Sequence, residues 1–143
     1  MKSPLFLLLT LPLFTAPILA QPPAVPAVPA VPAVAPVVVA VNVTPEAAEK
    51  LLSANSKVIV LDVRTPEEFG RGHIAGAVNI SSADPEFDKK VGALDSTRPL
   101  LLHCASGGRS GRVLSKIEAL PFPAIYHMNG GFNAWRGRSG AGG

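Results

Sequence analysis

The chain has 143 residues, a formal net charge of +3 and one cysteine. Acidic and basic residues alternate without a basic block, so the charge pattern does not support nucleic-acid binding. The three histidines and the cysteine are scattered rather than set at metal-ligand spacing. We therefore expect no metal site, and we expect no other cofactor.

Residues 1–20 predict a secretory signal peptide. Lys2 precedes a leucine-rich run, and Ala20 supplies a small residue for cleavage. The alternative is an uncleaved membrane anchor, but the run is shorter than the roughly 20 apolar residues of a spanning helix, and prolines interrupt it. We expect an exported protein, periplasmic or secreted, without stable membrane insertion after cleavage.

Residues 21–36 form a Pro/Ala/Val-rich linker with proline at every third position over part of its length. Such a repeat favours polyproline II and prevents a helix or a central strand. The segment is either a semi-rigid stalk or a disordered leader left after export. The folded domain is expected at 37–138, with a Gly-rich tail at 139–143.

Strand-like and helix-like segments alternate through the predicted domain. The expected strands are 37–41, 58–63, the end of 72–80, 100–103 and 124–128. The expected helices are one opened by Thr44 and Pro45, a turn at 66–69, a weak helix at 84–91, one carrying Val113, Leu114, Ile117 and Leu120, and a short one at 131–135. This order predicts one α/β domain with a mostly parallel five-stranded sheet flanked by helices.

The single cysteine lies where a predicted buried strand gives way to a helix. After Cys104 come small residues, and Arg109 and Arg112 follow. Backbone N–H groups in such a loop can turn inward, and the next helix adds its positive dipole end, so we expect thiolate to be favoured. A lone cysteine in an exported chain is an intermolecular disulfide, an inert buried thiol or a reactive thiol, and these surroundings favour the last.

Four stretches together resemble the rhodanese family of sulfurtransferases. Residues 61–69 and 72–80 are similar to its first signature, 104–110 to its active-site loop, and 130–135 to its closing motif. With its leader, the chain resembles the single-domain periplasmic rhodaneses of the phage-shock protein E kind. The resemblance implies a rhodanese-like fold for the whole predicted domain.

The resemblance also implies a mechanism. Cys104 would take the outer sulfur of a small anionic donor such as thiosulfate and pass it, as a persulfide, to cyanide, a thiol or a protein acceptor. Arg109 would hold the donor. The residues expected to bind substrate through the loop are Ala105, Ser106, Gly107, Gly108 and Ser110.

Two other functions remain as alternatives. Four residues separate Cys104 from Arg109, whereas the phosphatases that share the fold have five, which disfavours a phosphatase or arsenate reductase. A non-catalytic binding or sulfur-carrier module would be marked by loss of the cysteine or the arginine, and both are present.

Two charged residues at the end of the second predicted strand are expected to support the site. Asp62 either orients the catalytic loop or pairs with Arg64. Arg64 is also expected to form a local ion pair with Glu67 or Glu68, although an exposed pair contributes little stability.

Two histidines near the motifs are expected to be structural. His73 lies in a glycine-flanked turn. His103 directly precedes the nucleophile, so its side chain should point to the opposite face of the strand from Cys104. We therefore expect neither histidine to act as the base for the thiol.

Overall fold

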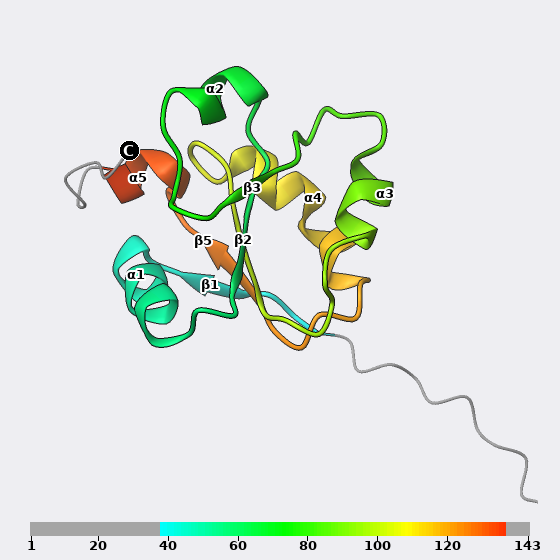
Figure 1. Ribbon diagram of the computed structural model, residues 1–143, viewed down its shortest axis with the longest axis horizontal. Helices are drawn as coiled ribbons and strands as arrows, with labels where there is room; N and C mark the ends of the chain where they lie inside the picture. Colours follow the sequence, from blue (N-terminus) through cyan, green and yellow to red (C-terminus); the bar gives the residue numbers. More distant parts are fainter. Residues whose placement is uncertain (1–37, 137–143) are drawn as a thin grey trace, which may run out of the picture. The chain divides into compact units, whose positions relative to one another are not determined.

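The computed structural model describes residues 38–136, which form the ribbon of Figure 1. The predicted signal peptide, the linker at 21–36 and the tail at 139–143 lie outside the described residues. Within 38–136, none of the helices combines the length and the apolar character needed to cross a membrane.

Five parallel strands form one sheet in the order β1-β5-β4-β2-β3. Their bounds are β1 Val41–Val43, β2 Ile59–Asp62, β3 Val78–Asn79, β4 Leu100–His103 and β5 Ile125–Met128. Every residue of β2 and β4 is buried, as expected for parallel strands covered on both faces. The prediction of one α/β domain with a parallel five-stranded sheet is confirmed.

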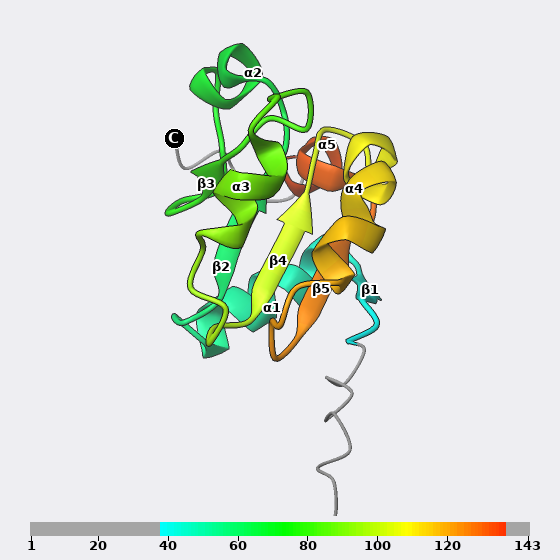
Figure 2. The ribbon, with the colours of Figure 1, turned by 90° about the vertical axis from the view of Figure 1, so that its right-hand side faces the viewer.

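Helices cover both faces of the sheet (Figures 1 and 2). Their bounds are α1 Pro45–Ala54, α2 Pro66–Gly70, α3 Phe87–Gly92, α4 Gly108–Glu118 and α5 Gly131–Arg136. Side chains of α3 and α4 pack in one core cluster, with alternate residues of β2 and β4. Side chains of α1 and α5 pack in the other cluster, on the opposite face.

Two predicted boundaries are wrong. The first strand was expected at 37–41 but is Val41–Val43, because these residues pair with β5 in the register Val41↔Tyr126 and Val43↔Met128. The weak helix was expected from residue 84, but α3 begins at Phe87 because Asp84 forms a turn in which its carboxylate accepts the Glu86 N–H at 2.8 Å. The start of α1 is as predicted, with the Thr44 hydroxyl accepting the Ala47 N–H.

Candidate active site

The loop after β4 wraps around a sulfur atom. Cys104 directly follows β4, and α4 begins at Gly108. Gly107 has φ +103°, a left-handed conformation that glycine adopts without steric cost. This turn directs the Gly107 N–H to Cys104 Sγ at 3.1 Å. The predicted arrangement of a thiol in a loop with inward N–H groups is present.

The N-terminal end of α5 holds the outer side of the same loop. The N–H of Phe132 donates to the Cys104 carbonyl at 2.8 Å, and that of Asn133 donates to the Ala105 carbonyl at 2.9 Å. Gly131, with φ +57°, lies so close that an added Cβ would be 2.4 Å from the Cys104 carbonyl oxygen. Because the carbonyls are bound to α5, the loop N–H groups stay directed toward the sulfur.

The environment of Cys104 favours its ionised form. The residue is only 1% exposed, and burial by itself raises the pKa of the thiol. Hydrogen bonds from the Ser110 hydroxyl and from the backbone N–H groups of Ser110, Ser106 and Gly107 act in the other direction, and the pKa lies below its ordinary value. The loop residues that donate to sulfur are thus among those predicted to bind substrate.

Arg109 is held at the edge of the loop by α2. Its Nη1 and Nη2 donate to the two carboxylate oxygens of Glu68 at 2.5 and 2.7 Å. Glu68 also completes a capping box with Thr65, whose N–H donates to Glu68 Oε2. The Arg109 hydrogen bonds lower the pKa of Glu68 to about 2, despite the opposing effect of burial. The Arg109 side chain is one-third exposed, so solvent and a small anion can reach it.

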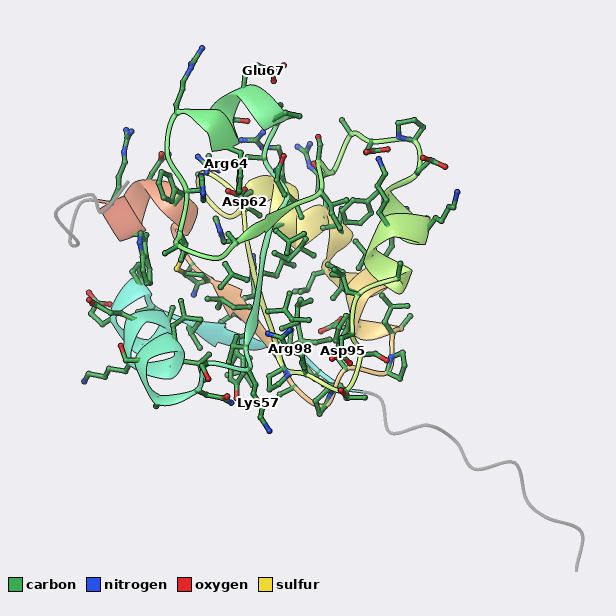
Figure 3. The ribbon with its side chains drawn as sticks, in the orientation of Figure 1. Lys57, Asp62, Arg64, Glu67, Asp95 and Arg98 are labelled. Atoms are coloured by element: carbon green, nitrogen blue, oxygen red, sulfur yellow. The ribbon has the colours of Figure 1, made fainter. Side chains whose placement is uncertain are left out.

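The expected pairing of Arg64 with Glu67 or Glu68 is wrong. Arg64 forms a buried ion pair with Asp62, at 2.6 Å between Nη2 and Oδ2, and the two side chains lie together at the end of β2 in Figure 3. Glu67 lies on the exposed side of α2, and Glu68 forms an ion pair with Arg109. The expected partners differ from the observed one because the Arg64 guanidinium turns back to Asp62, two residues earlier, and not forward to α2.

The Asp62–Arg64 pair supports the loop indirectly, through α5. The Arg64 guanidinium carbon lies 4.2 Å from the centre of the Phe132 ring, and Nη2 donates to the Gly72 carbonyl at 2.8 Å. Phe132 in turn binds the Cys104 carbonyl through its N–H. The pair therefore packs against the helix that holds the cysteine loop, and the supporting role of Asp62 and Arg64 stays a prediction.

The two histidines of the motifs lie away from the sulfur. His103 is fully buried, its Nδ1 is 3.1 Å from the Cys104 carbonyl, and its Nε2 has no hydrogen-bond partner. The ring packs toward Phe132 on the α5 side of the sheet, whereas Cys104 belongs to the cluster on the other face. His73 is exposed and stacks on Phe69.

A third histidine, which sequence reasoning missed, lies next to the site. His127 in β5 has Nε2 2.8 Å from the Ser110 hydroxyl, which is itself 3.4 Å from Cys104 Sγ. Its Nδ1 is 3.0 Å from Asn42 Oδ1. Side chains alternate along a strand, which places His127 on the face of the sheet that α4 covers. This alternation in the predicted strand 124–128 is the sequence feature from which its position next to the site could have been predicted.

Across 38–136, no three His, Cys, Asp or Glu residues gather into a group that could bind a metal ion. The site thus consists of a buried thiol, a ring of hydrogen-bond donors and a cation at the edge. A thiol in such surroundings is able to act as a nucleophile when it ionises.

The chain belongs to the rhodanese-like domain family, which it matches over residues 44–138. It is 30% identical over 95 residues to the thiosulfate sulfurtransferase GlpE of Stutzerimonas stutzeri, covering 66% of this chain and 83% of that protein. It is 33% identical over 104 residues to thiosulfate sulfurtransferase 16, chloroplastic, of Arabidopsis thaliana, covering 66% and 85%.

Solved structures show the same fold. A rhodanese-related protein from Thermoplasma volcanium superposes with a TM-score of 0.61 at 25% identity, covering 69% of this chain and 93% of that one. A rhodanese-like domain protein from Staphylococcus aureus gives a TM-score of 0.58 at 26% identity, with coverage of 66% and 90%.

Proposed function

We propose that the protein is a sulfurtransferase that moves sulfane sulfur from a small anionic donor such as thiosulfate to cyanide or a thiol through a Cys104 persulfide. The observation that carries the proposal is the hydrogen-bonded state of Cys104 Sγ, which accepts from the Gly107 N–H and faces the Ser110 hydroxyl. The thiosulfate sulfurtransferases among the relatives support the same chemistry.

In the first step the Cys104 thiolate attacks the outer sulfur of the donor. A new S–S bond forms, the donor S–S bond breaks, and sulfite leaves with the electron pair. In the second step the acceptor attacks the outer sulfur of the persulfide, and the Cys104 thiolate leaves. The loop donors stabilise an anionic sulfur at the start of the first step and at the end of the second.

Arg109 supplies the positive charge that an anionic donor needs. Its bond to Glu68 uses two of its N–H groups and fixes its direction, and the remaining N–H groups are free of Glu68 to bind a sulfonate. A donor that binds here is oriented by a cation whose position is set by α2.

The acceptor must be a separate molecule or another protein. Cys104 is the only cysteine of the chain, so no second thiol of the same chain can discharge the persulfide. We further propose that the transfer takes place after export, in the periplasm or outside the cell, as the sequence of the leader indicates.

Intact mass spectrometry after incubation with thiosulfate tests the proposal. The expected result is a gain of one sulfur atom that a reducing agent or cyanide removes and that Cys104→Ser abolishes. The absence of the adduct with thiosulfate and with other persulfide donors would contradict sulfur transfer. A stable adduct that neither cyanide nor thiols discharge would indicate a carrier rather than an enzyme.

A further inference from the structure

A chain of polar contacts links the sulfur to the edge of the sheet. It runs from Cys104 Sγ to Ser110 Oγ at 3.4 Å, on to His127 Nε2 at 2.8 Å, and from His127 Nδ1 to Asn42 Oδ1 at 3.0 Å. Asn42 and His127 are direct partners in the parallel register of β1 and β5. The pairing of β1 with β5 therefore fixes the end of this series of contacts that is farthest from the sulfur.

The hydrogen positions in this series of polar contacts can be assigned from the groups that only accept. Asn42 Oδ1 accepts only, so His127 Nδ1 carries a hydrogen, and Nε2 of the neutral ring is then a bare acceptor. Ser110 has one hydroxyl hydrogen but three partners, namely Nε2, Sγ and the Gly107 carbonyl at 3.1 Å. The protonation of His127 therefore decides what Ser110 presents to the sulfur.

With Nε2 bare, the Ser110 hydrogen points to His127, and an oxygen lone pair faces the sulfur. This arrangement suits a thiol, which donates its own hydrogen to Ser110. With Nε2 protonated, the ring donates to Ser110, whose hydrogen is then free to turn to the sulfur and stabilise a thiolate.

We propose that His127 is a positioning residue that couples the ionisation of Cys104 to its own protonation through Ser110. The S–H bond of Cys104 breaks as its proton passes to Ser110 Oγ, while the Ser110 proton passes to His127 Nε2. A thiolate and an imidazolium result, and Asn42 accepts the Nδ1–H in both states. The coupling deepens the proposed sulfur transfer, on which its functional meaning rests.

The surroundings of His127 leave it available for this role. Of the ionisable residues on α4, Arg109 pairs with Glu68, Lys116 pairs with Asp88, Glu118 accepts the Ala40 N–H, and Arg112 is exposed. On β4, His103 lies on the opposite face, and β1 carries no ionisable side chain.

Burial lowers the pKa of His127, which disfavours the imidazolium when no anion is nearby. The imidazolium is then favoured by the thiolate formed in the same step, because opposite charges that are close together stabilise each other. Two groups linked in this way titrate as a pair.

The test follows the ultraviolet absorbance of the thiolate against pH, without any sulfur donor. Cys104 is the only cysteine, so the signal belongs to one group. We expect His127→Phe to raise the Cys104 pKa by about one unit, an approximately tenfold lower thiolate population at a fixed pH below the pKa. His127→Gln, whose amide donates to Ser110 but takes up no proton, should recover part of this loss. The exposed His73→Gln is the matched control and should change nothing.

A reciprocal measurement needs no change at His127. The coupling is a free energy shared by two sites, so Cys104→Ala, which removes the thiolate, is expected to lower the His127 pKa, measured from the ring NMR signals. An unchanged His127 titration in Cys104→Ala would overturn the proposal, even if His127→Phe fails to fold. So would an unchanged thiol pKa in a folded His127→Phe. Because no persulfide is formed in either experiment, failure here is distinct from failure of sulfur transfer.

Discussion

The contact between α5 and the catalytic loop predicts that Gly131→Ala damages both stability and thiol chemistry. An ideal Cβ at this position lies 2.4 Å from the Cys104 carbonyl oxygen and 2.7 Å from the carbonyl carbon and oxygen of Ala105. All three neighbours are backbone atoms, so no flexible side chain can give way. The residue also has φ +57°, where alanine is strained.

The size of the effect follows from these distances. Real Cβ contacts stay above 3.0 Å, so the Cys104 carbonyl must move by at least 3.0 − 2.4 = 0.6 Å. The bond that Phe132 donates to this carbonyl, now 2.8 Å, is then stretched or lost, at about 1 kcal/mol. The left-handed conformation costs a further ~1–2 kcal/mol. We expect a total loss of about 2–3 kcal/mol, or ~10 °C in the melting temperature of a domain of this size.

Denaturant unfolding and alkylation of Cys104 measure the two consequences. We expect a lower unfolding midpoint and a several-fold slower alkylation at neutral pH, because the displaced loop no longer directs its N–H groups to the sulfur. Gly92→Ala is the control, since no atom lies within 4 Å of its added Cβ and its φ is ordinary. A Gly131→Ala protein with wild-type midpoint and alkylation rate would refute the view that α5 holds the loop.

Three further predictions concern charged and ionisable groups. Arg109→Ala should lower kcat/KM for thiosulfate by about tenfold or more, whereas Arg112→Ala, on the exposed side of the same helix, should not; equal losses would place the anion site elsewhere. The pKa of Glu68 is lowered from 4.5 to about 2, so its ion pair should stabilise the fold fully above pH 4.5 and lose this effect as the pH falls toward 2. Glu68→Gln, compared with wild type by unfolding at several pH values, should remove this dependence, which is worth no more than about 1 kcal/mol for so exposed a pair. Burial lowers the pKa of His103 below 6.5 in the folded protein. As the pH drops below 6.5, this histidine therefore takes up a proton in the unfolded chain before it does so in the folded one, and the free energy of unfolding should fall. His103→Phe should flatten that slope, and an unchanged slope would contradict a neutral buried ring.

The parts of the fold that were predicted correctly depend on neighbours in sequence. The apolar run of β4 has the predicted bounds, Leu100–His103, because it is continuously buried and is followed at once by a turn. Thr44 and Pro45 begin α1 through a cap that spans three residues. The cysteine loop is equally local, since the Gly107 N–H reaches a sulfur three residues away.

The parts that were missed depend on residues far apart in sequence. Glu68 and Arg109 are 41 residues apart, and Asn42 and His127 are 85 residues apart. No periodicity or cap records which distant strand or helix will lie alongside. The register of β1 against β5 is of the same kind, and it moved the first strand from 37–41 to Val41–Val43.

Contacts between residues far apart in sequence also bear on the proposed function. The motif around Cys104 contains the sulfur and its nearest donors, but distant residues determine how those groups behave. Glu68 fixes the cation, Gly131 lets α5 approach the loop, and His127 contacts the hydroxyl that faces the sulfur. A chain could keep 104–110 unchanged, lose these partners, and retain a cradle that binds anions without an activated thiol. The proposed sulfur transfer therefore depends on these three distant partners as well as on the cysteine and the arginine of the motif.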